Sequence, residues 1–135
     1  AIRSLARQWS EQTSIPVELD IDPGLGRLPE TIELSVFRII QEGLSNVRKH
    51  ATASQVALDL YRTPKASLLV RLTDDGLGMD ESLDLASLAE QKHFGLVGIS
   101  ERVSLLDGTL ELKSPQNGGL ELEIEIPSPY PSIQN

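Results

Sequence analysis

The spacing of apolar residues along the chain predicts alternating helices and strands. Helices are expected where apolar residues recur every three or four positions, over residues 1 to 13, 31 to 50 and 95 to 106. Strands are expected where apolar and polar residues alternate, over residues 16 to 21, 55 to 62, 67 to 73, 109 to 113 and 120 to 126. The run at 67 to 73, SLLVRLT, has few polar positions, which is typical of a central strand.

Turn and cap residues divide these elements. Asn117-Gly118 between the last two strands indicates a tight hairpin, and Gly108 is expected to cap the preceding helix at its C-terminus. Thr31 is a candidate N-cap for the long helix, although Pro29 could also open it. Strands in mostly hairpin-like order with helices between them predict an α+β fold. We expect a two-layer α/β sandwich, with helices on one face of a mixed, mostly antiparallel sheet.

Length and charge narrow the class of protein. The 135 residues are enough for one domain, 1 to 135, with a substantial core. A net charge of −8 argues against nucleic-acid binding and against docking on anionic lipid. There is no cysteine and no long apolar run, so we expect neither disulfides nor a membrane span. The sequence opens within a helical pattern and without Met, and we expect it to be a cytoplasmic piece of a longer protein. The proline-rich end cannot continue a sheet, and residues 128 to 135 are expected to be disordered.

Four polar residues share one face of the helix at 31 to 50. Glu42, Asn46, Lys49 and His50 follow one another at spacings of four, seven and eight residues from the first. The amide oxygen of Asn46 suits Mg²⁺, which prefers oxygen ligands, and Lys49 and His50 could face phosphate. Glu42 could be a general base or an outer partner of the metal. Solvated helix charges are the plain alternative for Glu42 and Lys49.

Two glycine-containing segments follow. In Asp74-x-Gly76-x-Gly78 a carboxylate at a strand end could accept the amino group of adenine, while the glycines allow close backbone approach. An acidic turn is the alternative. In Gly95-Leu96-Val97-Gly98 a helix start without side chains in the way could bind an anion, or it could serve helix–sheet packing. The P-loop signature is absent from the sequence.

Taken together, these segments resemble the catalytic and ATP-binding domain of sensor histidine kinases, in the GHKL superfamily. The run from Glu42 to Ala51 is similar to that family's N box, and Asp74 to Gly78 is similar to its first glycine box. The run from His93 to Arg102 is similar to its second glycine box, and Gly118-Gly119 with the strand to Pro127 is similar to its closing hairpin. The resemblance covers residues 1 to 127 and is strongest to the compact subgroup that pairs with helix-turn-helix response regulators.

The resemblance implies roles for single residues. Asp74 would bind adenine, with Gly76 and Gly78 bordering the base, and Asn46 would bind Mg²⁺. Lys49, His50 and the helix start at Gly95, Leu96 and Gly98 would lie near the phosphates of ATP, and residues 80 to 94 would form a lid that is mobile without nucleotide. The family usually has a hydroxyl residue after the last glycine. Leu120 stands there instead, which puts a water-mediated contact to adenine in doubt.

The implied activity is transfer of the γ-phosphate of ATP to a histidine on a dimerisation domain outside this chain. Neither His50 nor His93 stands in an acceptor context, where Asp or Glu follows the histidine. A response regulator would be the next partner, in a parent protein that is a homodimer. The alternatives are a GHKL serine kinase of the anti-sigma type, a gyrase-like ATPase clamp in which Glu42 activates water, and a non-catalytic nucleotide-binding module.

Overall fold

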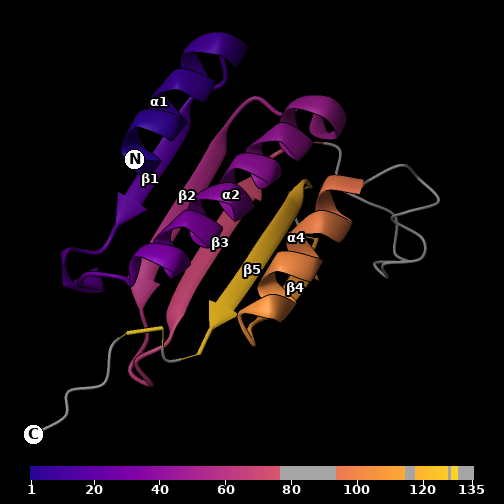
Figure 1. The fold of residues 1–135 in the computed structure, drawn as a ribbon. Helices are drawn as coiled ribbons and strands as arrows, with labels where there is room; N and C mark the ends of the chain where they lie inside the picture. The colour runs from indigo at the N-terminus through magenta and orange to yellow at the C-terminus, as the bar shows by residue number, and fades with distance from the viewer. Residues whose placement is uncertain (77–93, 115–117, 128, 131–135) are drawn as a thin grey trace, which may run out of the picture.

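The computed structural model describes residues 1–76, 94–114, 118–127 and 129–130. Along the chain the elements are α1 (Ile2–Thr13), β1 (Val17–Ile21), the 3-10 helix η1 (Pro23–Leu25), α2 (Glu30–Asn46), the π-helical turn η2 (Val47–Ala51), β2 (Val56–Arg62), β3 (Leu68–Asp74), α4 (Phe94–Leu105), β4 (Thr109–Lys113) and β5 (Leu120–Ile126) (Figure 1). The expected lid falls outside the described residues, except for Phe94, where α4 begins. In the described part of the chain, no helix combines the length and the apolar character that a membrane span needs.

The five strands form one sheet in the order β1-β2-β3-β5-β4. The pair β1–β2 is parallel, and the other three pairs are antiparallel. The most apolar strand, β3, therefore lies at the centre, as its composition predicts. The sheet is mixed and mostly antiparallel, which confirms the sequence-based expectation.

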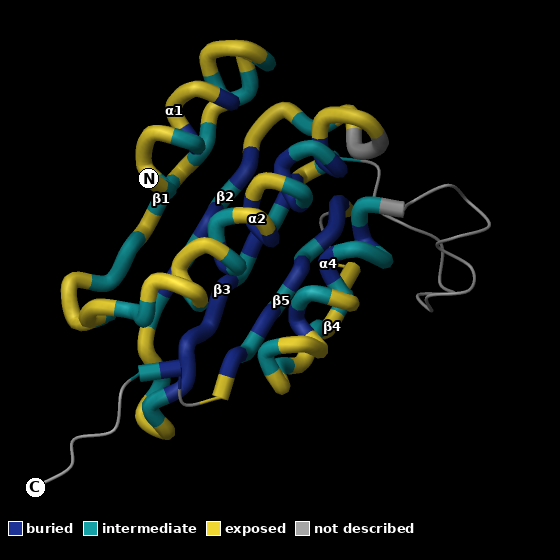
Figure 2. The backbone as a smooth tube through the Cα atoms, viewed as in Figure 1, coloured by how far each residue is buried: buried dark blue, intermediate teal, exposed yellow. Residues whose placement is uncertain are grey.

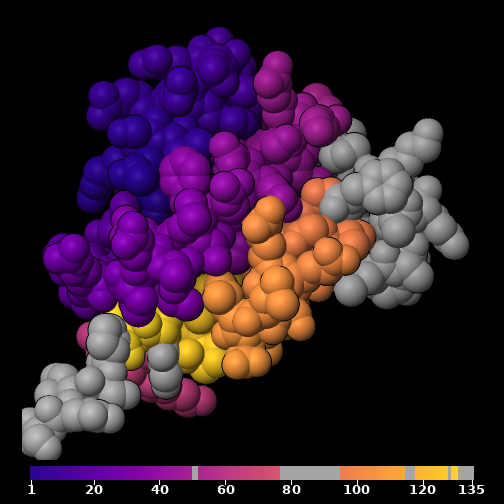
Figure 3. Space-filling model, viewed as in Figure 1, coloured from indigo at the N-terminus to yellow at the C-terminus, as the bar shows by residue number. Residues whose placement is uncertain are grey.

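The helices α1, α2 and α4 cover a single face of this sheet (Figures 1 and 2). On β2, β3 and β5 the alternate residues that face the helices are buried, which gives these strands their period-two pattern. In the space-filling view the side chains of the three helices cover most of the sheet on this side, and β5 shows at the lower edge (Figure 3). The fold is thus the predicted two-layer α+β sandwich.

Close packing of α2 on the sheet depends on Gly43. A Cβ atom at this position would lie 2.6 Å from Cδ2 of Leu72 on β3. The contact sets the last turns of α2 over the last residues of β3. Asp74 at the end of β3 is paired with Val56 at the start of β2 and with Leu120 at the start of β5. The ends of α2 and β3 and the starts of α4 and β5 therefore gather at one end of the sheet (Figure 1).

The start of α2 agrees with one of the two expected N-terminal boundaries, and its end differs from the expectation. Helix α2 begins at Glu30 with Pro29 as its N-cap, so Thr31 lies inside the helix. The α-helix ends at Asn46, and the chain continues as a wider π-helical turn to Ala51. A long helix with one uniform repeat was expected up to His50. The extra residue in a π turn changes the direction of the side chains that follow Asn46.

The end of α4 is closed by Asp107 rather than by Gly108. Asp107 has a φ of 56°, in the left-handed region, and the N–H of Gly108 donates to the carbonyl of Val103. Gly108 is needed for a different reason. A Cβ atom there would lie 2.7 Å from the carbonyl oxygen of Glu125 on β5. The glycine therefore allows close packing of a turn on the sheet, and the left-handed residue that caps the helix is Asp107.

The chain beyond β5 returns to the body of the domain at Pro129 and Tyr130. Pro129 is buried, and the guanidinium of Arg62 lies 4.0 Å from the centre of the Tyr130 ring. Gly26, with a φ of 77°, packs against the same ring. At these two residues the tail is therefore packed, whereas disorder was expected from residue 128. Residues 128 and 131–135 lie outside the described part of the chain.

Candidate functional site

Two residues on the last turns of α2 carry buried oxygen atoms that have no hydrogen-bond partner among the described residues. One is Oδ1 of Asn46, a residue that is 6% exposed. The other is Oε2 of Glu42, one turn earlier. Buried acceptors without partners are costly and uncommon in folded proteins. Their placement next to each other indicates a site that receives a ligand with donor groups or a cation.

The second oxygen of Glu42 is bound to α4. The Nε of Arg102 lies 3.3 Å from Oε1 of Glu42, which joins the two helices by a charged hydrogen bond. On the same face of α4, one turn earlier, a Cβ atom at Gly98 would lie 2.8 Å from Oε2 of Glu42. Gly98 thus leaves the room that the carboxylate occupies. The glycine therefore allows close packing of α4 on α2, whereas the alternative considered for it from the sequence was packing of a helix on the sheet.

Asp74 is a buried carboxylate at the end of β3, with an exposed fraction of 5%. The N–H of Gly76 donates to its Oδ1 at 2.8 Å. Burial raises the pKa of Asp74 above its ordinary value, and the charge of Asp75 acts in the same direction. Hydrogen bonds from the backbone N–H groups of Gly76 and Leu120 partly offset this. A carboxylate with this environment keeps acceptor capacity for a donor from a ligand.

The next residue, Asp75, holds the strand end in place. Its Oδ1 accepts the N–H of Ser54 at 2.7 Å and that of Gln55 at 3.0 Å, and its Oδ2 accepts the hydroxyl of Ser54. These hydrogen bonds lower the pKa of Asp75. They tie the end of β3 to the segment between η2 and β2. Asp75 therefore stabilises the frame of the site rather than facing its interior.

The other residues predicted for the site differ in where they lie and in whether the structure describes them. Gly95 stands at the start of α4, where a Cβ atom would be 3.9 Å from the carbonyl oxygen of Glu42. Leu96 is fully buried in the core, so only its backbone is free to face a ligand. Lys49 is exposed on the π-helical turn. The side chain of His50 and all of Gly78 lie outside what the structure describes.

Arg102 is the residue of this site to which the sequence analysis gave no role. It stands four residues after Gly98, so the two share a helix face. A carboxylate on one helix and an arginine on the other could have been paired only once the packing of α2 on α4 was known. The spacing of apolar residues predicts the helix α4, but it does not predict which helix α4 packs against.

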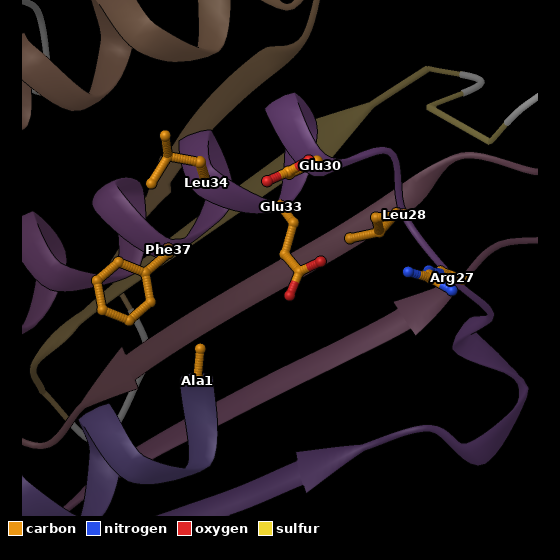
Figure 4. A pocket seen from close by; sticks show the side chains of 7 residues that line it. All are labelled: Ala1, Arg27, Leu28, Glu30, Glu33, Leu34 and Phe37. Carbon is orange, nitrogen blue, oxygen red and sulfur yellow. The ribbon is translucent and has the colours of Figure 1, made fainter.

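A large cavity between α1 and α2 lies away from these groups. A space of about 630 Å³ separates the start of α1 from α2 and is lined by Ala1, Leu28, Glu33 and Phe37, among others (Figure 4). In Figure 4 the side chains of Glu33 and Phe37 project from α2 toward this space. None of the predicted site residues lines it. We therefore take the buried polar atoms of Glu42, Asn46 and Asp74, and not the size of a cavity, as the markers of the candidate site.

A cation at this site would need ligands beyond the protein. In the described part of the chain, three or more histidine, cysteine or acidic residues nowhere come together as a metal site. Mg²⁺ is usually held by one or two protein oxygens together with waters and the phosphates of a substrate. The single unpaired amide oxygen of Asn46 fits that mode of binding.

Comparison with known families defines the class. Residues 31–130 match the family described as "Histidine kinase-, DNA gyrase B-, and HSP90-like ATPase". The chain belongs to this family of ATP-binding domains. Within it, the chain is the ATP-binding catalytic domain of a two-component sensor histidine kinase, in the group that includes DegS, UhpB and NarQ.

Individual relatives agree with this placement. The chain is 35% identical over 128 residues to the signal transduction histidine-protein kinase/phosphatase DegS of Brevibacillus brevis, covering 93% of this chain and 31% of that protein. It is 37% identical over 131 residues to UhpB of Salmonella typhimurium, covering 96% of this chain and 24% of that protein. The chain therefore spans less than a third of these curated relatives.

Solved structures show the same fold. The histidine kinase domain of the Erythrobacter litoralis EL346 blue-light activated histidine kinase matches with a TM-score of 0.76 at 21% identity, over 93% of this chain and 58% of that one. The ATP binding domain of PrrB from Mycobacterium tuberculosis matches with a TM-score of 0.71 at 20% identity, over 94% and 90%. The predicted GHKL architecture is confirmed.

Proposed function

We propose that this domain binds Mg²⁺–ATP between α2, α4 and the end of β3 and transfers the γ-phosphate to a histidine on a dimerisation domain outside this chain. The observation that carries the proposal lies at one end of the sheet. The Asp74 carboxylate is buried there, and so is Oδ1 of Asn46, which has no hydrogen-bond partner in the part of the chain that the structure describes. One of these atoms suits the amino group of a base, and the other suits the cation that accompanies a triphosphate.

Asp74 would select adenine. Its carboxylate accepts from the N–H groups of Gly76 and Leu120 and still has acceptor capacity for the exocyclic amino group of the base. The backbone contact through Leu120 needs no hydroxyl side chain. The leucine side chain is itself buried in the core. The departure from the family pattern at this position therefore leaves the direct contact of Asp74 with the base available.

The triphosphate would extend along the last turn of α2 toward the start of α4. Asn46 would hold Mg²⁺, which neutralises charge on the phosphates when bound. The backbone N–H groups at Gly95 and Leu96 would face the anion, because a helix start carries unpaired donors and partial positive charge. The exposed Lys49 and, by sequence, His50 and Gly78 complete the set of proposed contacts.

Glu42 would act as the general base. The acceptor imidazole nitrogen attacks the γ-phosphorus, the bond from phosphorus to the β,γ-bridging oxygen breaks, and ADP leaves. The proton that the attacking imidazole loses would go to the carboxylate of Glu42, on the last turns of α2. A response regulator would then receive the phosphoryl group. We propose that the parent protein is a homodimer that presents this domain to the ATP of the cytoplasm.

Calorimetry with a non-hydrolysable ATP analogue, with and without Mg²⁺, tests nucleotide binding. Asp74→Asn should weaken binding of the analogue by roughly ten- to a hundredfold, because a charge-assisted hydrogen bond contributes about 1.5–3 kcal/mol. Binding of inorganic triphosphate should change little, since it has no base. Equal loss for both ligands would show that Asp74 does not read adenine, and no heat at millimolar nucleotide would refute the site.

The nature of the transferred label separates the candidate functions. The chain alone should not label itself from ATP, and its dimerisation domain supplied in trans should acquire an acid-labile label. An acid-stable label on a protein partner would instead support a GHKL serine kinase. ATP binding without transfer to any acceptor would support a non-catalytic nucleotide-binding module.

A further inference from the structure

Strand β1 is an edge of the sheet, and in the described part of the chain no strand pairs with its outer side (Figure 1). The carbonyl of Pro16 and the N–H of Asp22, which flank this strand, both bond to β2. Successive residues of a strand direct their backbone groups to opposite sides. Val17, Leu19 and Ile21 therefore direct their N–H and C=O groups away from β2, as a row of unpaired donors and acceptors.

The apolar side chains of β1 are only partly covered. Val17, Leu19 and Ile21 are half-buried, whereas the residues paired with them on β2 are fully buried. A hollow of about 400 Å³ lies between β1 and α1 and is lined by Val17 and Leu19 and, from α1, by Arg3 and Arg7, among others. Helix α1 thus leaves room beside the edge, and a further strand there would complete the burial of these side chains.

The two faces of β1 carry opposite charges. On the face of the sheet without helices, Glu18 and Asp20 are exposed and form no ion pair with any described residue. Asp20 stands directly opposite Asp59 on β2, and like charges so placed repel. Burial raises the pKa of Asp59, and the charge of Asp20 raises it further. On the helix side, Arg3 and Arg7 are exposed and likewise form no ion pair among the described residues.

We propose that the outer edge of β1 binds an extended segment of a partner protein, which adds to the sheet as a further strand and carries lysine or arginine at every second position. The basic side chains would lie beside Glu18 and Asp20. The residues between them would be apolar, or acidic where they meet Arg3 and Arg7. Main-chain hydrogen bonds would supply affinity, and the alternation of side chains would supply specificity. The inference does not rest on the proposed function.

A second copy of this chain fits the edge poorly. If two β1 strands paired in antiparallel fashion about Leu19, Glu18 of each would stand opposite Asp20 of the other on the same face, where like charges repel. Charges on an edge strand commonly prevent such self-association. The same two carboxylates would favour a basic partner, so one feature both excludes a wrong partner and selects the right one.

Two synthetic peptides test the charge pattern. The first is Lys-Val-Lys-Glu-Lys-Val-Lys, and the second is Glu-Val-Glu-Lys-Glu-Val-Glu, in which every charge is reversed. Both are blocked at their ends and carry a fluorescent label, and fluorescence anisotropy measures their affinity at one ionic strength, because salt screens such pairs. The first should bind about tenfold more tightly or better, since several cross-strand pairs change sign between them. Equal affinities would overturn the inference.

A proline on the edge tests whether the peptide pairs with the backbone. The N–H of Leu19 is not used in pairing with β2, so Leu19→Pro removes an outward donor and places a ring on the edge, where proline is tolerated. Leu19→Ala is the matched control, because it loses the same side chain and keeps the N–H. The proline variant should bind the first peptide about tenfold more weakly than the alanine variant. Equal binding by the two would place the peptide elsewhere and overturn the inference.

Charge reversal on β1 tests the position without a change of backbone, so it decides the question even if the proline variant does not fold. Glu18→Lys combined with Asp20→Lys should reverse the preference between the two peptides. Glu33→Lys combined with Glu101→Lys changes the net charge equally at exposed positions on α2 and α4, and it should keep the preference of the parent chain. A reversal by both pairs would show that only net charge matters.

Two further measurements complete the test. The thermal midpoint and the affinity for nucleotide should stay close to those of the parent in the charge variants of β1, since this edge is separate from the residues of the candidate site. Sedimentation should show that the chain does not self-associate through β1. A dimer that Leu19→Pro abolishes and Leu19→Ala retains would show that a second copy occupies the edge, and it would overturn the choice of a basic partner.

Discussion

Gly119 lies so close to Asp74 that a Cβ atom on the glycine would be 1.9 Å from the carbonyl oxygen of the aspartate. The chain that leads into β5 thus passes directly against the residue proposed to read the base. Gly119 also has a φ of 91°, which L side chains rarely adopt. Its neighbour Gly118, with a φ of 86°, has more room, since the nearest atom to its Cβ would be 3.5 Å away.

Gly119→Ala should be strongly destabilising and should also impair nucleotide binding. The left-handed backbone adds about 1–2 kcal/mol, and overpacking against Asp74 adds about 1–3 kcal/mol. Gly118→Ala should show the first contribution only. Chemical denaturation of both variants measures the difference. Gly24→Ala is the control, because its Cβ would make only ordinary contacts with the side chain of Asp22 and its φ is not positive. Equal destabilisation of the two hairpin variants would show that the overlap with Asp74 relaxes freely.

Nucleotide affinity should depend on pH through Asp74. Because its pKa is raised above the ordinary value of 3.8, the carboxylate takes up a proton at a higher pH than an exposed aspartate does. The protonated form no longer accepts as an anion, so affinity for the ATP analogue should fall as the pH falls through this raised pKa. Calorimetric titrations in Asp74→Asn should lack this step, although protonation of the base itself remains in both proteins. If the affinity of the parent and of Asp74→Asn fell equally with falling pH, the decline would come from protonation of the ligand and not of Asp74.

Asp75 should contribute to stability with the opposite pH dependence. Its folded-state pKa is lowered by the Ser54 and Gln55 donors, so its contribution is present above the ordinary carboxyl value and is lost as the pH falls through the lowered one. The thermal midpoint of Asp75→Asn should lie below that of the parent at neutral pH, and the gap should close in acid. Ser54→Ala, which keeps both backbone donors, should show a smaller gap at neutral pH. A difference in thermal midpoint that does not vary with pH would contradict stabilisation by the charged carboxylate of Asp75.

Tyr130 should stabilise the domain through its ring and not through its hydroxyl. Among the described residues the buried hydroxyl has no hydrogen-bond partner, so Tyr130→Phe should be neutral or raise the unfolding free energy by about 1 kcal/mol. Tyr130→Leu should lower it by about 0.5–1 kcal/mol or more, because the cation–π contact with Arg62 is lost. Urea denaturation of the two variants measures both unfolding free energies. A phenylalanine variant as unstable as the leucine variant would mean that the hydroxyl has a partner in solution.

The strands of this domain could be predicted well, because one covered face imposes an alternation that is visible in the sequence. Val56 to Leu60 and Leu120 to Ile126 alternate in composition and in burial alike. The boundaries of α2 were less accessible. Pro29 and Thr31 were both reasonable openings. The change to a π turn after Asn46 has no signature in the residue types, since it depends on how the helix end meets the sheet.

The residues of the candidate site also divide into those that the sequence predicts and those that it does not. Asp74, Asn46 and Glu42 could be selected because each combines a chemical type with a place at the end of an element. Arg102 could not, since its role depends on which carboxylate α4 meets when it packs on α2. Gly108 was given the right importance for the wrong reason, because contact with β5 is invisible before the sheet order is known. Packing between distant elements is what the sequence patterns leave undetermined.

The parallel pairing of β1 with β2 makes α2 part of the folding route as well as of the site. Parallel neighbours cannot be joined by a tight turn, and here residues 22–55 make the connection, with α2 within it. The entropy of closing such a connection is lost before the pairing rewards it. We therefore expect β1 to join the sheet late, after α2 has settled on β3. The helix that presents Glu42 and Asn46 must then be in place before the sheet is complete, so a chain arrested at that stage would already contain most of its nucleotide site.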